Sequence, residues 1–197
     1  SIVLIYNNAI NVTDNGLTDS YAIFAEESDV SILDNNVTYV GNTSGETINN
    51  AVCLNDCAES LIGGNVFDIS IPSCYVDWKE IPPGSGVWVK FPVSEGLVFN
   101  NCSDLNFTDN RVDVEANSAI GSFDTIYAID IKDSDNVSVC DNAIGASGFS
   151  YVYGLYIEAD DSIVDSNTFI IKSSNYANGI EIEASLNATV SNNSIIV

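Results

Sequence analysis

Carboxylates are the only abundant groups in this chain that could do acid–base chemistry. The 197 residues contain no histidine, which excludes Ser-His-Asp and Cys-His catalysis and any zinc site built on imidazole. Cys53 and Cys57 are four positions apart, a spacing that fits neither a metal-binding nor a redox CxxC motif. What remains is a set of acids and tyrosines at repeated positions, in particular Asp130, Tyr156 and Glu181.

These three residues are expected to form one outward-facing column. They occupy equivalent positions in three short alternating segments, AIDIK, GLYIE and GIEIE. If such segments stack about 4.8 Å apart, Asp130 and Glu181 lie about 9.6 Å apart, just beyond the carboxyl separation of an inverting glycosidase. Tyr156 between them would complete a sugar-binding groove, and the alternative is a solvated strand face. The next outward positions hold a second column, Lys132, Glu158 and Glu183.

The segments that would position these columns belong to a repeat. An Asn with an apolar residue three positions before it and another two positions after it returns at intervals of 27, 30, 45, 32, 25 and 26 residues. Alternating apolar segments flank each Asn, with no helical stretch between them. Three short strands per repeat predict an all-β parallel β-helix of about seven coils, formed by residues 1–197 as a single domain. The crossover rule for parallel strands predicts right-handed winding.

The repeated Asn has a structural interpretation. At a corner of the coil, Asn tolerates a left-handed or bridging backbone better than most residues. Its amide can also bond the equivalent Asn one coil away, so that a buried column satisfies its own hydrogen bonds. We therefore predict an Asn ladder without a catalytic role, made of Asn8, Asn35, Asn65, Asn110, Asn142, Asn167 and Asn193.

One interval of the repeat is too long. The 45 residues between Asn65 and Asn110 predict an insertion within 68–95, between the third and fourth coils, which holds all four Pro and both Trp. Pro cannot donate a hydrogen bond to a ladder of strands, so this segment is expected to leave the stack as a loop or small hairpin. Trp78 and Trp88 would either cover the flank of the solenoid or form a lateral contact patch with another subunit.

Charge and composition point to an extracellular protein. Five Lys+Arg against 28 Asp+Glu give a net charge of −23, which disfavours nucleic acid and anionic membrane surfaces as partners. No apolar run is long enough to insert into a membrane. The chain has no Met and starts at Ser1, so we expect a mature or excised segment of a secreted protein.

Eight asparagines fit the N-glycosylation sequon, which favours secretion over mere richness in Asn, Ser and Thr. The candidates are Asn11, Asn36, Asn42, Asn101, Asn106, Asn136, Asn187 and Asn192. No cofactor is expected. Stacked carboxylates such as Glu158 and Glu183 repel each other by about 1 kcal/mol in water, so weak calcium binding along this face is a further hypothesis.

The cysteines are candidates for disulfide bonds between coils. Cys57 and Cys102 each lie eight residues before their ladder Asn, in one column with Ser134 and Ser185. Stacked Cα atoms about 4.8 Å apart are within disulfide range, and two small buried thiols are the alternative. The remaining candidates for a free thiol or an intermolecular bond are the outward-facing Cys53, Cys74 in the insertion and Cys140 at an exposed corner.

This pattern resembles the right-handed parallel β-helix repeats of the pectate-lyase-like superfamily. It looks most like the Asn-rich, acidic, His-poor sheath and adhesin-like surface proteins of methanogenic archaea, over Val3 to Val197 apart from the insertion. The resemblance implies a durable extracellular envelope and a structural subunit, not an enzyme. The alternatives are an adhesin-like module that binds a glycan or another cell, and a polysaccharide-degrading enzyme. A lyase would need a cluster of Arg or Lys beside its acids, and this face offers only Lys132.

The expected partner is a second copy of the chain. The sequence starts and ends within a coil and shows no capping element, so the outermost strands would pair with those of the next subunit, head to tail. Intermolecular disulfides could then join neighbouring chains. The candidate contact residues at the two ends are Val3, Ile5, Ile195 and Val197.

Overall fold

The structure is a computed structural model of the whole chain, and it describes residues 1–14, 19–41, 48–71, 75–80, 88–116, 125–183 and 185–197. For 75–80 and 88–92 only the backbone is described. Within these residues every regular element is a β-strand. The described part contains no helix long and apolar enough to cross a membrane.

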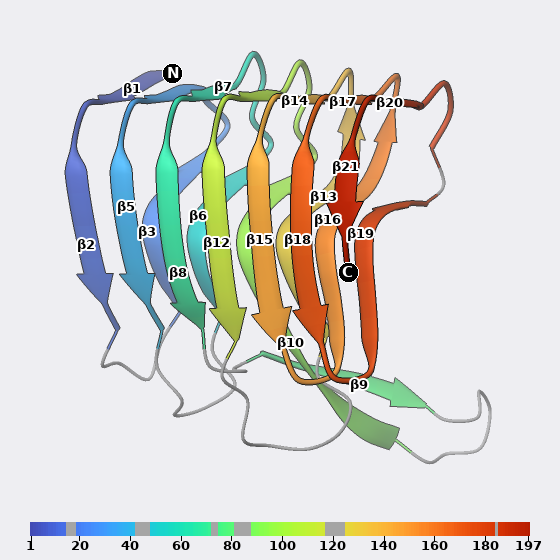
Figure 1. Cartoon of the computed structure of the whole chain (residues 1–197). Helices are drawn as coiled ribbons and strands as arrows, with labels where there is room; N and C mark the ends of the chain where they lie inside the picture. The colour runs from blue at the N-terminus through green and yellow to red at the C-terminus, as the bar shows by residue number, and fades with distance from the viewer. Residues whose placement is uncertain (15–18, 42–47, 72–74, 81–87, 117–124, 184) are drawn as a thin grey trace.

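The strands form three parallel sheets, which the chain visits in turn (Figure 1). Sheet A contains β1 (Ile2–Tyr6), β4 (Asp29–Leu33), β7 (Leu61–Gly63), β11 (Asn106–Thr108), β14 (Ser138–Cys140), β17 (Ile163–Asp165) and β20 (Thr189–Ser191). Sheet B contains β2 (Ala9–Thr13), β5 (Asn36–Val40), β8 (Val66–Ile71), β12 (Arg111–Ala116), β15 (Ala143–Gly148), β18 (Thr168–Ser173) and β21 (Ser194–Ile196). Sheet C contains β3 (Ser20–Glu26), β6 (Asn49–Asn55), β10 (Trp88–Asn100), β13 (Thr125–Asp135), β16 (Tyr151–Asp160) and β19 (Tyr176–Ile182).

The predicted all-β, parallel solenoid is therefore confirmed, with a slightly different number of coils. Sheet C has six parallel strands on its main path, whereas sheets A and B have seven each. In the described part of the chain, six turns are thus complete with three strands. The seventh turn contributes only β20 and β21, so the prediction of about seven full coils was slightly too high.

The core is a continuous column of apolar side chains between the three sheets. Alternate residues of each strand point inward, as in β4, where Val30 and Ile32 are buried. Phe67, Phe107 and Phe169 come from different coils and are fully buried. Each turn packs mainly on its neighbours, so stability accumulates from one coil to the next.

The repeated asparagines join consecutive coils by hydrogen bonds. Asn65 donates both its backbone N–H and its side-chain amide to Asn110 Oδ1, each at 3.0 Å, and its amide also donates to the Ile32 carbonyl at 2.7 Å. The same pair of bonds links each Asn to the next one from Asn8 to Asn193. Carbonyls and amides at this buried corner are thereby satisfied.

The left-handed residue at this corner is the one before the ladder Asn, not the Asn itself. We expected Asn for its backbone tolerance, but φ lies between 52° and 66° at the preceding position of all seven coils. The preceding residues are Asn7, Asp34, Gly64, Asp109, Asp141, Ser166 and Asn192. The ladder position is Asn because its amide both donates and accepts across coils.

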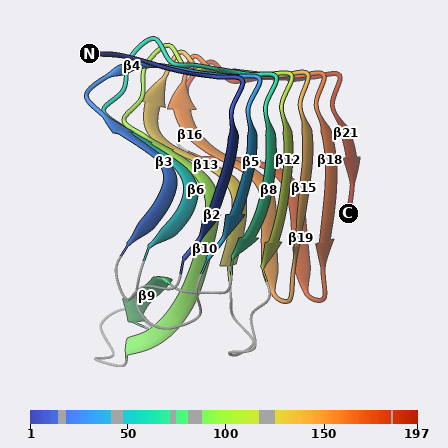
Figure 2. The same cartoon turned by 90° about the vertical axis from the view of Figure 1, so that its left-hand side faces the viewer.

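A column of small residues bends sheet C toward sheet B. Figure 2 shows β3, β6 and β10 curving with their convex side toward β2, β5 and β8. A Cβ atom at Gly154 would lie 2.7 Å from the Gly179 carbonyl oxygen and 2.8 Å from Ile171 Cδ1 of β18. The sheets approach too closely there for larger side chains, and the outer face of sheet C is correspondingly concave. The column is Ala22, Ala51, Gly96, Ala128, Gly154 and Gly179.

Acids alternate with amides along the exposed corners, which accommodates part of the negative charge. Asn136 donates its side-chain amide to Asp104 in the preceding coil, and Asn187 donates to Asp161 at 2.9 Å. The neutral side chain of Asn136 thus separates the carboxylates of Asp104 and Asp161. The sequon asparagines that the structure describes are all exposed: Asn11, Asn36, Asn101, Asn106, Asn136, Asn187 and Asn192. Asn42 lies outside the described residues.

The insertion is a β-hairpin and is shorter than the predicted 68–95. Ile71 still pairs with Ala116 in sheet B, and Val93 already pairs with Thr125 in sheet C. Between them, β9 (Tyr75–Glu80) runs antiparallel to the first half of β10. Trp78 pairs with Lys90 and Trp88 with Glu80 in the backbone register. The side chains of both Trp lie outside the described part, so a flap and a contact patch both remain predictions.

The predicted Cys57–Cys102 disulfide is absent, although the two residues occupy adjacent coils. Both thiols are free and buried. Cys57 Sγ donates to the Asn55 carbonyl at 3.3 Å and Cys102 Sγ to the Asn100 carbonyl at 3.5 Å, as Ser134 Oγ does to the Lys132 carbonyl. The thiols therefore take the place of serine hydroxyls in a corner column, and each is directed at the preceding coil, Cys57 toward the Ala25 carbonyl and Cys102 toward the Leu54 carbonyl.

Cys53 does not suit an intermolecular bond, contrary to the prediction made from its outward-facing position. Cys53 is only 5% exposed, and burial raises the pKa of its thiol to about 11. Cys140 is half-buried, with its Sγ 3.2 Å from Ser138 Oγ. Cys74 lies outside the described residues.

Replacing Cys102 by Ser is expected to leave the fold intact. A hydroxyl can make the same bond to the Asn100 carbonyl, as serine does at position 134, so the unfolding free energy should change by less than about 1 kcal/mol. Burial raises the pKa of the Cys102 thiol to about 12, so we also expect no labelling by thiol reagents in the folded state. Chemical denaturation and mass spectrometry check both points. A large loss of stability that reductant reproduces in the unmutated protein would instead indicate a disulfide.

Candidate ligand-binding groove

The concave outer face of sheet C brings the predicted acid column together. Asp130 pairs in register with Tyr156 on β16, and Tyr156 with Glu181 on β19. A parallel row on the other side of the bend contains Glu95 of β10, Tyr127, Tyr153 and Asn178. Side chains of the two rows meet on this concave face, which we call the sheet C groove.

Five tyrosines form a contiguous aromatic surface in this groove. The rings of Tyr127 and Tyr153 stack with centroids 4.9 Å apart, and Tyr156 meets Tyr127 edge-on at 5.5 Å. Tyr176 lies 5.8 Å from both Tyr151 and Tyr153. Tyr151 and Tyr176 are 37% and 45% exposed, so a ligand can reach this end of the cluster.

An ion cluster lies next to the tyrosines, with Asp130 buried and the Lys132 side chain 38% exposed. Asp130 is on the outer face of β13 but has no exposed surface. Its Oδ2 accepts a hydrogen bond from Lys132 Nζ at 2.5 Å, and the same ammonium lies 3.4 Å from Glu95 Oε1. Lys132 Nζ is also 5.7 Å from the centre of the Tyr127 ring and 6.0 Å from that of Tyr156, within cation–π range. The Lys132 ammonium thus contacts two carboxylates and two aromatic rings.

This cluster raises the pKa of Asp130 to about 7. Burial is the largest cause, the neighbouring Glu95 carboxylate adds to it, and Lys132 opposes both. Asp130 Oδ1 has no hydrogen-bond partner among the described residues, which fits a carboxyl group that carries a proton. Burial also raises the pKa of Tyr153, to about 12, so this phenol stays neutral at physiological pH.

The raised pKa of Asp130 predicts a pH dependence of stability. The folded state keeps the proton up to about pH 7, whereas an unfolded Asp releases it near 3.8. Between these values the folded state binds more protons, so the unfolding free energy should fall as the pH rises and level off above 7. Asp130→Asn should flatten this slope, because Asn carries no titratable group and can still accept a hydrogen bond from Lys132. Urea denaturation from pH 4 to pH 8 measures both slopes, and equal slopes would contradict the assignment.

Asp130 is too deeply buried to contact a sugar in the groove. Of the predicted pair, only Glu181 is accessible, and its Oε2 accepts a hydrogen bond from Asn178 at 3.0 Å. Glu183 of the second column accepts one from the Tyr156 hydroxyl at 2.7 Å. The described residues contain no group of three or more acids or cysteines placed to hold a metal ion, so calcium binding at Glu158 and Glu183 stays a hypothesis.

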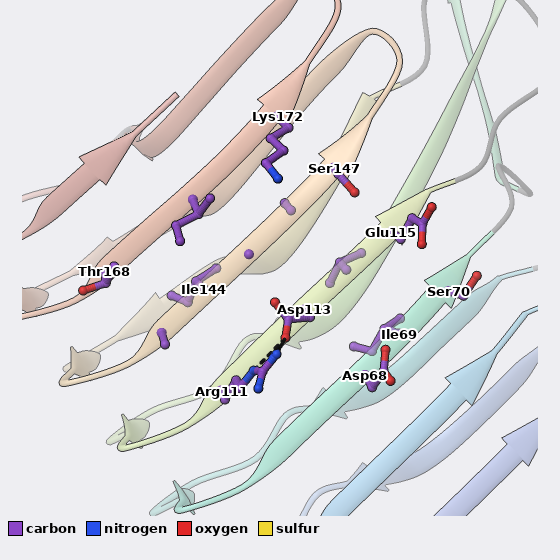
Figure 3. Close-up of a pocket in the computed structure, with 15 residues that line it drawn as sticks. Asp68, Ile69, Ser70, Arg111, Asp113, Glu115, Ile144, Ser147, Thr168 and Lys172 are labelled. Carbon is purple, nitrogen blue, oxygen red and sulfur yellow. Dashed lines mark hydrogen bonds and ion pairs between the residues drawn. The ribbon is translucent and has the colours of Figure 1, made fainter.

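A second depression, of about 530 Å³, lies on the outer face of sheet B (Figure 3). Its floor is β15, where Ala143 and Gly145 leave space between β12 and β18. Arg111 and Asp113 form an ion pair of 2.6 Å on one side, and Lys172 lies on the other. No aromatic side chain lines it. Acids and bases alternate around it, so it offers neither a stacking surface nor a dominant charge.

Sequence reasoning placed Asp130, Tyr156 and Glu181 in one column but missed most of the groove. Glu95 was missed because its strand was expected to start at the next residue, Gly96. The missed tyrosines also precede the small residues at which their strands were expected to start. Tyr127 lies directly before Ala128, and Tyr153 directly before Gly154. A signal was present, because the missed tyrosines form two pairs at equivalent positions of adjacent repeats: Tyr127 with Tyr153, and Tyr151 with Tyr176.

Comparison with known proteins gives no further guide to this groove. No protein-family model, no curated protein and no solved structure matches the chain.

Proposed function

We propose that this β-solenoid is a glycan-binding module of an extracellular surface protein, with the sheet C groove as its binding face. The observation that carries the proposal is the five-tyrosine cluster on three consecutive coils, open to solvent at Tyr151 and Tyr176 and bordered by Glu181. This is the adhesin-like alternative that the sequence left open, and extracellular location and right-handed winding belong to the same proposal.

The chemistry of the groove suits a sugar chain. Aromatic faces pack against the C–H groups of pyranose rings, while phenol, amide and carboxylate groups bond the ring hydroxyls. Successive coils are about 4.8 Å apart, so the groove repeats its contacts along the axis and can follow a linear polymer. The adjacent ion cluster holds Tyr127 and Tyr156 in place, which limits the ordering cost on binding.

Binding should depend on the exposed tyrosines. We expect Tyr176→Ala to weaken binding of a linear oligosaccharide at least about tenfold, because it removes a stacking ring at the open end of the groove. The matched control is Phe24→Ala on β3, an exposed aromatic of the same sheet several coils away. Screening against a panel of oligosaccharides, followed by calorimetry, measures the effect. The proposal would be wrong if both variants lost the same binding affinity, or if no oligosaccharide in the panel bound the unmodified protein.

End-to-end assembly is a second candidate, supported by the polarity of the Asn ladder. Every bond in the ladder runs from an Asn to the Oδ1 of the next one, so Asn8 Oδ1 has no donor among the described residues. At the other end, the backbone N–H of Asn193 has no acceptor there. The two faces are complementary, and an adjoining turn with Asn at the ladder position could come from a second copy or from a longer chain.

Assembly of this segment can be measured directly. Light scattering and electron microscopy of residues 1–197 should show elongated particles whose length grows with protein concentration. Asn8→Ala should raise the protein concentration at which the particles lengthen, because it removes the hydrogen-bond acceptor Asn8 Oδ1 at one end of the solenoid. Particles of monomer size at every concentration would exclude assembly through these faces.

A further inference from the structure

We infer that the sheet C groove selects glycans that carry protonated amines over neutral or acidic ones. The inference rests on the proposed glycan binding and names its ligand class. It starts from one corner of the groove, where the rings of Tyr153 and Tyr176 lie 5.8 Å apart at an angle of 51°. Glu181 lies near Tyr153, the register partner of Asn178, and accepts a hydrogen bond from the Asn178 amide at 3.0 Å.

The protein already binds one ammonium group with these components. Lys132 Nζ lies against the faces of Tyr127 and Tyr156 and is bound by the buried Asp130. That arrangement of two tyrosines and two carboxylates, Asp130 and Glu95, is occupied by the chain's own cation.

The corner at Tyr153 and Tyr176 has two tyrosines and one carboxylate, Glu181, and no cation from the described residues. Glu181 makes no ion pair among the described residues, and its Oε1 accepts no hydrogen bond there. Its carboxylate lies close enough to add to the effect of burial on the Tyr153 pKa. An ammonium group seated here would meet two ring faces and one unpaired carboxylate oxygen.

The charge of the whole molecule acts in the same direction. With a net charge of −23, the chain attracts cationic polymers and repels uronic acids at long range. A glycan with free, protonated amines would therefore be attracted by the net charge of the protein and would also pair with the Glu181 carboxylate. N-acetylation of the same sugar removes the charge and keeps the ring, so it isolates the contribution of the amine.

The test compares three oligosaccharides of equal length: glucosamine, N-acetylglucosamine and galacturonic acid oligomers. At about pH 6 we expect the unmodified protein to bind the amine oligomer about tenfold more tightly than the acetylated one. The uronic acid oligomer should bind weakest. Equal binding of the amine and acetylated forms, or tighter binding of the uronic acid, would overturn the inference.

Two variants separate the site from the bulk charge. Glu181→Gln should abolish the preference for the amine and keep binding of the acetylated oligomer. Glu115→Gln removes the same charge from an exposed position of β12 on sheet B and should leave the preference unchanged. Equal effects of the two variants would show that bulk charge alone is responsible and would overturn the inference. If the acetylated oligomer binds through Tyr176 without any amine preference, the proposed function stands and this inference fails. If none of the three binds, both fail.

Discussion

Asn110→Ala is expected to destabilise the solenoid by at least about 3 kcal/mol, because each buried polar group left without a partner costs about 1 to 3 kcal/mol. Asn110 Oδ1 accepts from the backbone and the side chain of Asn65, and its own amide donates to the Ile62 carbonyl and to Asn142. Alanine removes all four bonds at a site in the middle of the stack. The break would affect the coils on both sides.

The matched control for this substitution is Asn8→Ala at the exposed start of the same ladder. Asn8 donates to Asn35 but accepts no hydrogen bond at its Oδ1 among the described residues, and solvent can replace its partners. Its loss should cost less than about 1 kcal/mol. Chemical denaturation followed by circular dichroism measures both. A central substitution no worse than the terminal one would show that the column is not a main source of stability.

Lys132→Met is expected to have the second large effect, and one that depends on pH. Breaking a buried ion pair by removing one partner typically costs about 3 to 5 kcal/mol, and the cost here should lie below that range because the Lys132 side chain is 38% exposed and partly screened by solvent. At pH 8 Asp130 is largely ionised in the unmodified protein, and without Lys132 it must take up a proton or stay beside Glu95 without a cation. At pH 5 Asp130 carries a proton with or without Lys132, so the loss at pH 8 should exceed the loss at pH 5 by about 1 kcal/mol, the equivalent of one pH unit above the Asp130 pKa.

Two further variants test the cause of this effect. Combining Lys132→Met with Asp130→Asn should restore most of the stability at pH 8, since the uncompensated carboxylate is gone. Lys172→Met removes an exposed lysine from β18 and should change little at either pH. The interpretation would be wrong if Lys132→Met cost the same at both pH values. Failure of Asp130→Asn to restore stability would contradict it as well.

The architecture was predictable because every coil repeats the same constraints. The Asn intervals and the alternation in segments such as AIDIK indicate three strands per turn, and the sheets follow that order. The hairpin was predicted from its Pro content, but its limits were not. Strand β10 starts at Trp88, within the inserted stretch, and continues without interruption into sheet C. A one-dimensional pattern cannot show that a strand extends beyond the stack to which it belongs.

The groove was only partly predictable, because its depth comes from packing between sheets. Alternation places Asp130 outward, and outward residues are normally taken as solvated. The alternation breaks at Ala128 and Ile129, which are consecutive and both fully buried. That break marks the bend, and the bend buries Asp130. The partnership with Glu95 was not foreseeable, since the two residues are 35 positions apart and Glu95 directly follows the inserted hairpin.

The register of the three sheets also determines how this chain can change length in evolution. Asn142 and Asn167 occupy the same corner one turn apart, and Ala143 pairs with Thr168. Deleting residues 143–167 would join equivalent points of the repeat and remove one whole turn without changing the register of what remains. A deletion one residue longer or shorter would turn the inward side chains of the next strand outward. Insertions and deletions within the coils should therefore be tolerated only when they add or remove whole turns. The inserted segment between β8 and Val93 lies outside the stacked turns, so its length is not constrained in this way.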